Sequence, residues 1–157
     1  MSYDFRDLEA FHGVMVFCEQ RQGKLMSTDF ELVSEARKLA DDLGTEVIGL
    51  VLGSDCSGMP AEIAGYGADK VIVCEDPHLK DYTTDAYTSV ICDVVREYKP
   101  EVFLFGATNI GRDLAPLLPV PKRLHLAHSL HIPSACRADL EGNPVWSLLV
   151  QCPWSPG

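Results

Sequence analysis

"GVMVFCE" (residues 13–19) is a short, continuous apolar run with alternating β-branched residues, which is typical of a strand buried on both faces. Three similar runs follow it along the chain: "EVIGLVLG" (46–53), "ADKVIVCED" (68–76) and "EVFLFGAT" (101–108). Each of them predicts a further buried strand.

Helical patterns separate these four runs. After a turn at "QRQGK" (20–24), Ser27 and Thr28 offer N-caps to a helix that continues to about Leu43 and stops at Gly44. Its apolar stripe consists of Val33, Ala36, Ala40 and Leu43.

A short helix is predicted in "MPAEIAGYG" (59–67), and a longer one ends before Pro100. The longer helix has apolar residues four apart at Ala86, Val90 and Val94, with Tyr87, Ile91 and Val95 beside them.

The alternation of strands and helices with short links predicts an α/β fold: an open parallel sheet with helices on both faces. We expect an α/β domain over residues 13–135, an N-terminal extension over 1–12 and an irregular tail over 136–157.

Ligands of such sheets gather at the carboxyl ends of the strands. The loops after Glu19, Gly53, Asp76 and Thr108 are therefore the expected functional edge.

Charge and hydropathy exclude several classes of partner. The chain of 157 residues has 13 basic and 23 acidic residues, a net charge of −10, which repels nucleic-acid backbones and anionic membrane surfaces. No apolar run approaches the roughly 20 residues of a membrane span. The N-terminus resembles neither a signal peptide nor a transit peptide, so the expected location is the cytoplasm.

The cysteines are scattered and form no C-x-x-C pair. Reduced thiols without metal or disulfide are expected. They are Cys18, Cys56, Cys74, Cys92, Cys136 and Cys152.

"FLFGATNIGRDLAP" (103–116) combines a strand, a glycine-containing loop and a helix start, where backbone N–H groups favour an anion. However, Gly106 and Gly111 fit neither the P-loop pattern nor G-x-G-x-x-G, so a tight turn is the favoured interpretation. Asp113 suits the positive end of the helix dipole. Arg112 does not, and must be held by a carboxylate or a partner.

A metal site at His125, His128 and His131 is not expected, because on a helix the first and third side chains diverge by about 120°, and on a strand residues three apart face opposite sides. No nucleophile elbow is present, and Asp55, Asp76 and Asp81 fit solvated loop caps. The sequence therefore predicts no catalytic, cofactor-binding or metal-ligating residue.

Four segments together resemble the N-terminal domain of the electron transfer flavoprotein alpha subunit. They are "GVMVFCEQRQGKL", "EVIGLVLGSD", "YGADKVIVCEDPHLKDYTTDAYTSVI" and "EYKPEVFLFGATNIGRDLAP". The resemblance covers about residues 13 to 116, with the motifs in the right order and at the right spacing.

The resemblance implies an adenine-nucleotide-hydrolase-like, Rossmann-like fold and a heterodimer with a beta subunit. It implies an electron carrier, not an enzyme, that links acyl-CoA dehydrogenase-type flavoenzymes, as in fatty acid β-oxidation, to an acceptor. In this family FAD lies chiefly in a separate C-terminal domain of the alpha subunit, and AMP is held by the beta subunit. The alpha N-terminal domain forms part of the shell against which beta packs.

The resemblance ends after about residue 116. Where the family continues with a basic, Ala-rich helix, this chain has "LLPVPKRLHLAHSLHIPSAC" (117–136), in which Pro119 and Pro121 would break a helix. The sequence is therefore interpreted as a truncated or frame-disrupted alpha subunit without the FAD domain. Two alternatives remain open: a stand-alone nucleotide-binding module of the universal stress protein type, and a non-functional fragment.

Overall fold

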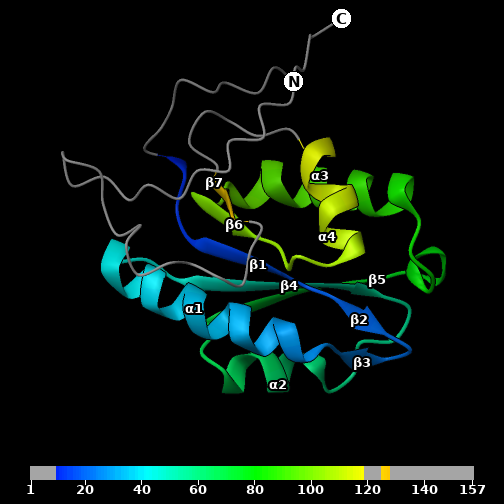
Figure 1. Cartoon of the computed structure of the whole chain (residues 1–157), viewed down its shortest axis with the longest axis horizontal. Helices are drawn as coiled ribbons and strands as arrows, with labels where there is room; N and C mark the ends of the chain where they lie inside the picture. The colour runs from blue at the N-terminus through cyan, green and yellow to red at the C-terminus, as the bar shows by residue number, and fades with distance from the viewer. Residues whose placement is uncertain (1–9, 119–124, 128–157) are drawn as a thin grey trace, which may run out of the picture.

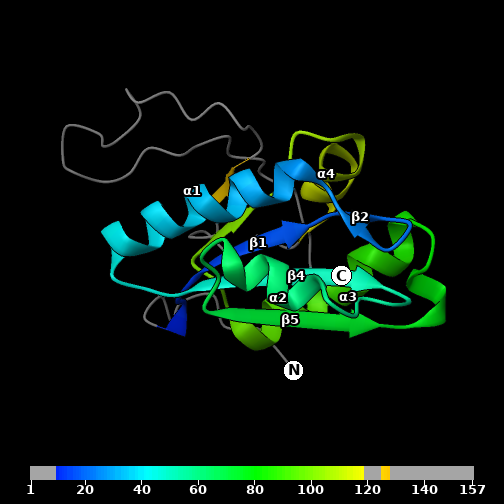
Figure 2. The same ribbon diagram turned by 90° about the horizontal axis from the view of Figure 1, so that it is seen from below.

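Five parallel strands form the central sheet in the part of the chain that the computed structural model describes, residues 10–118 and 125–127. Their order is β5-β4-β1-β6-β7. Figure 2 shows β1, β4 and β5 running side by side in the same direction. The bounds are β1 Val14–Cys18, β4 Val47–Gly53, β5 Lys70–Glu75, β6 Val102–Leu104 and β7 His125–Ala127.

Helices cover both faces of this sheet, as Figure 1 shows. On one face lie α1 (Ser27–Leu43) and α2 (Met59–Gly65), and on the other lie α3 (Thr84–Tyr98) and α4 (Asn109–Leu114). Two 3₁₀ turns, η2 (Pro77–Leu79) and η3 (Ala115–Leu117), complete the described helical segments. The predicted α/β class is confirmed.

The central strand β1 explains why the sheet needs two helical layers. Val14, Val16 and Cys18 pack in the core beneath α1 and α2, whereas Met15 and Phe17 pack in the core beneath α3. All five side chains are at most 3% exposed. A strand with apolar residues on both sides can be buried only between two layers, which is the geometry of parallel sheets.

The strand order changes direction at β1. The chain passes from β1 to β4 and β5 on one side and then crosses to β6 on the other side. In open α/β sheets such a switch point leaves a crevice between the carboxyl ends of the two strands. Here the crevice lies between the ends of β1 and β6.

Most predicted boundaries agree with the structure within a few residues. Helix α1 stops at Gly44 in the left-handed conformation, with φ 68°, and α3 ends one residue before Lys99, which precedes Pro100. The predicted turn at 20–24 is a small hairpin: the turn itself is residues 22–23, and it joins two short antiparallel strands that the sequence did not predict, β2 (Gln20–Arg21) and β3 (Lys24–Leu25).

The predicted N-cap of α1 is wrong. The N-cap is Met26, and Ser27 and Thr28 already belong to the first helical turn. The carboxylate of Asp29 replaces the expected hydroxyl, because it reaches back and accepts a hydrogen bond from the Met26 backbone N–H at 2.9 Å. Thr28 Oγ1 is buried without a hydrogen-bond partner among the described residues.

Two differences concern the end of the domain. Strand β6 is shorter than the predicted 101–108, since Thr108 leaves the sheet to cap α4. The short strand β7 extends the sheet beside β6 and was not predicted. The tail 136–157, Pro119 and Pro121 lie outside the described residues, as does most of the extension 1–12.

None of the described helices is long and apolar enough to cross a bilayer.

Gly49 in β4 provides a test of how tightly α2 packs on the sheet. A Cβ atom at this position would lie 2.8 Å from Ile63 Cγ2. We expect Gly49→Ala to lower the free energy of unfolding by about 1–3 kcal/mol through overpacking, measured by urea denaturation. The same substitution in an Ile63→Ala background should be markedly less harmful, because the contacting methyl group is gone. An equal penalty in both backgrounds would contradict this packing.

Candidate functional site

The crevice between β1 and β6 is closed by a hydrogen bond between two side chains. Glu19 follows β1, and Thr108 follows β6. Thr108 Oγ1 donates to Glu19 Oε2 at 2.6 Å, and Glu19 is only 4% exposed. A buried carboxylate therefore occupies the place where open α/β sheets usually receive a ligand.

The same hydroxyl also caps helix α4. Thr108 Oγ1 accepts a hydrogen bond from the Gly111 backbone N–H at 3.0 Å. A hydroxyl carries one donor and two acceptor sites, so it can serve Glu19 and Gly111 together. The N–H group at the centre of the candidate anion loop is thus already bonded within the protein.

Gly111 allows the backbone of this loop to pack closely against itself. A Cβ atom on Gly111 would lie 2.1 Å from the carbonyl oxygen of Gly106, which no side chain could tolerate. An anion at this loop would also meet the Glu19 carboxylate. The geometry therefore favours a structural turn over phosphate binding, as the sequence analysis does.

A second buried carboxylate lies beside the first. Asp29, 2% exposed, accepts from the Glu19 backbone N–H through Oδ1 at 3.0 Å and from the Met26 N–H through Oδ2 at 2.9 Å. The pKa of Asp29 is raised to about 7. Burial is the largest cause and the nearby charge of Glu19 acts in the same direction, whereas the two hydrogen bonds lower the pKa. Asp29 therefore connects the end of β1 to the start of α1.

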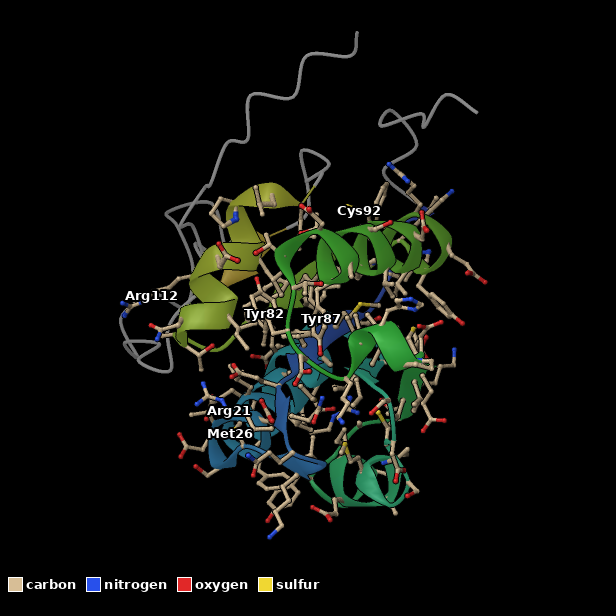
Figure 3. The ribbon with its side chains drawn as sticks, turned by 90° about the vertical axis from the view of Figure 1, so that its right-hand side faces the viewer. Arg21, Met26, Tyr82, Tyr87, Cys92 and Arg112 are labelled. Atoms are coloured by element: carbon tan, nitrogen blue, oxygen red, sulfur yellow. The ribbon has the colours of Figure 1, made fainter. Side chains whose placement is uncertain are left out.

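Arg21 satisfies the remaining oxygen of Glu19. Its Nε and Nη2 atoms lie 3.2 and 3.1 Å from Glu19 Oε1. The Arg21 side chain is 57% exposed, so this ion pair links the buried carboxylate to the surface. Figure 3 shows Arg21 and Met26 close together near the start of α1.

Asp113 and Arg112 on α4 play different roles. Asp113 accepts hydrogen bonds from the Tyr82 hydroxyl and, at 2.7 Å, from Thr84 Oγ1, and these bonds, that of Tyr82 first, lower its pKa. It thus ties α4 to the start of α3. Arg112 is exposed, points outward in Figure 3, and makes no ion pair with any residue of the described ranges.

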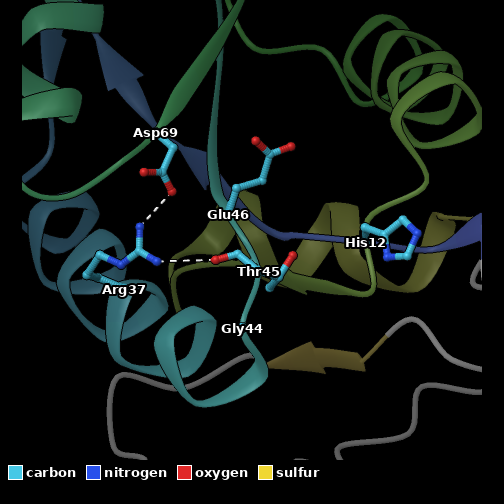
Figure 4. A pocket seen from close by; sticks show the side chains of 6 residues that line it. All are labelled: His12, Arg37, Gly44, Thr45, Glu46 and Asp69. Atoms are coloured by element: carbon cyan, nitrogen blue, oxygen red, sulfur yellow. Dashed lines mark hydrogen bonds and ion pairs between the residues drawn. The ribbon is translucent and has the colours of Figure 1, made fainter.

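A shallow hollow of about 620 Å³ lies at the opposite, amino end of the sheet (Figure 4). Its one cation, Arg37, is already bonded: the side chain lies 2.6 Å from Asp69 and 2.7 Å from Asp41, and it also donates to Thr45 O. Asp69 in turn accepts from the Val47 N–H. These bonds anchor the ends of strands and helix α1 and already engage the Arg37 guanidinium within the protein. The residues that line the hollow are His12, Arg37, Gly44, Thr45, Glu46 and Asp69.

The other residues singled out in the sequence do not converge. Asp55 accepts hydrogen bonds from Ser57, and Asp76 caps η2. Within residues 10–118 and 125–127, no three His, Cys, Asp or Glu side chains are grouped so as to hold a metal ion. His125 lies in β7, and His128 and His131 lie outside the described residues.

Four cysteines in the described residues are free thiols. Burial raises the pKa of each of them, most strongly for Cys18, which keeps thiols protonated and unreactive. They are Cys18, Cys56, Cys74 and Cys92; Cys136 and Cys152 lie outside the described residues.

Sequence reasoning missed the association of Glu19 with Asp29. The available signal was Asp29 three residues after Met26, a spacing that allows a carboxylate to bond back to the helix start. The loops after Glu19 and Thr108 were correctly placed at one edge of the sheet. Their direct hydrogen bond could not be inferred from periodicity.

The double role of the Thr108 hydroxyl predicts a distinct ranking of variants. Thr108→Val keeps the shape but leaves Glu19 Oε2 and the Gly111 N–H without their partner, so we expect a loss of about 1–3 kcal/mol in unfolding free energy. Thr108→Ser keeps the hydroxyl and should lose less. Urea unfolding measures both, and an equal loss for the two variants would show that the hydroxyl contributes nothing.

Comparisons with known proteins agree with the resemblance seen in the sequence. The family model "Electron transfer flavoprotein domain" matches residues 14–120. A protein of Anaerotignum propionicum, "Acryloyl-CoA reductase electron transfer subunit beta", is 60% identical over 116 residues, which is 74% of this chain and 32% of that protein. "Electron transfer flavoprotein subunit alpha" of Megasphaera elsdenii is 50% identical over 110 residues, 70% of this chain and 32% of its own.

Among solved structures, a universal stress protein from Archaeoglobus fulgidus aligns with a TM-score of 0.49 and 11% identity, over 74% of this chain and 93% of that one. The chain spans about a third of the length of the curated relatives named above. Because the family model matches more than half of the 157 residues, the chain belongs to the electron transfer flavoprotein domain family.

Proposed function

We propose that the described residues are the N-terminal α/β domain of an electron transfer flavoprotein alpha subunit and act as the scaffold of a heterodimeric electron carrier. The observation that carries the proposal is the family match over residues 14–120. Two findings support it: the relatives are named as electron transfer subunits, and the switch-point crevice holds the protein's own Glu19 carboxylate.

The proposed partner of this domain is an electron transfer flavoprotein beta subunit. Through the complete carrier, the electron donor would be an acyl-CoA dehydrogenase-type flavoenzyme or a related dehydrogenase, and AMP would be held by the beta subunit. Names of relatives point the same way, since one is a subunit of an acryloyl-CoA reductase and another of a lactate dehydrogenase. The proposed role is electron transport in the cytoplasm, not catalysis by this domain.

The described residues do not fit a flavin site. A flavin pyrophosphate needs free backbone N–H groups or cations in a cleft. The Gly111 N–H is capped by Thr108, and the adjacent Glu19 carboxylate would repel the pyrophosphate. If the carrier binds FAD, we propose that other parts of it do so.

Nucleotide binding of the universal stress protein type is the less favoured alternative. Two binding measurements, one with FAD and one with nucleotides, test the scaffold role against it. After incubation with excess FAD and desalting, we expect the 157-residue chain to be colourless. In calorimetry it should bind ATP and AMP no tighter than roughly millimolar, worth only about 4 kcal/mol. A near-stoichiometric flavin band, or micromolar nucleotide binding, would overturn the scaffold role.

Arg112 offers a test of the proposed partner. It is a cation without an ion pair among the described residues of an acidic chain, so we place it at the contact with the beta subunit. Coexpression with an electron transfer flavoprotein beta subunit should give co-purification, and Arg112→Ala should weaken the complex by about tenfold. The matched control is Arg96→Ala, since Arg96 is exposed and already paired with Asp93.

The assembly role would be contradicted if the wild-type chain did not associate with the beta subunit, even when the rest of an intact alpha subunit is supplied in trans. Equal effects of the two arginine substitutions would remove Arg112 from the contact and leave the assembly role standing.

A further inference from the structure

We propose that the β2–β3 hairpin is a proton-linked latch: the buried carboxylate of Asp29 holds both ends of the segment 19–26 when it is charged, and proton uptake weakens its hold on the end at Met26. This inference is independent of the proposed function, because it rests on the contacts and burial of Asp29.

In the latch, one side chain binds both ends of the hairpin segment. Asp29 Oδ1 accepts from the Glu19 N–H, just before β2, and Asp29 Oδ2 accepts from the Met26 N–H, just after β3. Both of its oxygens are therefore acceptors, one for each end. In a neutral carboxyl group one oxygen becomes a hydroxyl, which is a much weaker acceptor than a carboxylate oxygen, so protonation weakens one of the two bonds.

The charged state of Asp29 is poorly compensated. It is 2% exposed and has no cation partner among the described residues. Glu19, a second buried carboxylate, faces it from the end of β1, as does the Cys18 thiol of β1. Arg21 of the hairpin is bonded to Glu19, and Thr108, from the loop before α4, also donates to Glu19.

The end that opens follows from the hydrogen bonds. The Met26 N–H has a second acceptor, the Glu19 carbonyl oxygen at 3.2 Å, whereas Asp29 Oδ1 is the acceptor described for the Glu19 N–H. A proton on Oδ1 would weaken the bond of the Glu19 N–H, for which no second acceptor is described. A proton on Oδ2 affects the Met26 N–H, which still has the Glu19 carbonyl oxygen, so Oδ2 is the expected site of the proton. The Glu19 end stays bonded, and the Met26 end is left with its weaker contact.

The linkage to pH has a definite sign. The pKa of Asp29 is about 7 in the folded protein, above its ordinary 3.8, so between these values the folded chain holds a proton that the unfolded chain has lost. The contribution of Asp29 to global stability is thus largest at low pH and is lost as the pH rises through about 7. The latch behaves in the opposite way, since the Met26 hydrogen bond is strongest above about pH 7.

The test is an NMR titration of the full chain between pH 5.5 and 8.5. It follows the Asp29 carboxyl carbon and the amide exchange of Glu19 and Met26, corrected for the intrinsic pH dependence of exchange. We expect the carboxyl group to titrate near pH 7. Below the pH at which Asp29 titrates, protection of the Met26 amide from exchange should fall by about tenfold, which is the order of one lost hydrogen bond to a charged group. The Glu19 amide should stay protected.

Variants separate the latch from general loosening. Asp29→Asn should mimic the protonated state, with low and pH-independent protection at Met26, and Asp42→Asn, an exposed acid of the same helix, should behave as wild type. If Asp29→Asn does not fold, the wild-type titration decides alone. The proposal would be overturned if Asp29 titrated below pH 5. It would also be overturned if the protection of the Met26 amide did not change with pH, or if the protection of the Glu19 amide changed with it.

Discussion

The hydrogen bond between Thr108 and Glu19 is the constraint on which the carboxyl edge of this domain depends. It joins the loops that follow the two strands where the sheet order changes direction, at 2.6 Å, and its acceptor Glu19 is buried while Thr108 is half-buried. One hydroxyl thereby satisfies a buried carboxylate and caps a helix. The crevice that other α/β folds use for a ligand is here part of the protein's own hydrogen-bonding network.

Burial of this network has an electrostatic consequence. Glu19 is compensated by Arg21 and Thr108, whereas Asp29 has only backbone N–H groups. Two adjacent buried carboxylates, of which only Glu19 is bonded to a cation, disfavour a further negative charge at this edge. This argument supports the scaffold role proposed for the domain, and the chain belongs to the electron transfer flavoprotein domain family.

The sequence predicted the fold where local pattern determines it. The apolar run at Val14–Cys18 requires two covering layers, and Gly44 and Pro100 mark helix ends by backbone conformation alone. The N-cap prediction failed because Ser27 and Thr28 have the preferred residue types, while a carboxylate inside the helix made the bond. Strand β7 is only three residues long, too short for a periodic signal.

The site was less predictable, because its central contact joins residues 89 positions apart. The sheet topology predicts that the loops after Glu19 and Thr108 lie at the same edge of the sheet. It does not predict which of their side chains bond to each other. The most direct measurement of the scaffold account is a crystal structure of the chain grown with millimolar ADP. The account predicts Thr108 Oγ1 within hydrogen-bond distance of Glu19 and no phosphate density at Gly106–Gly111. A phosphate bonded to the Gly111 N–H, with Glu19 displaced, would contradict it.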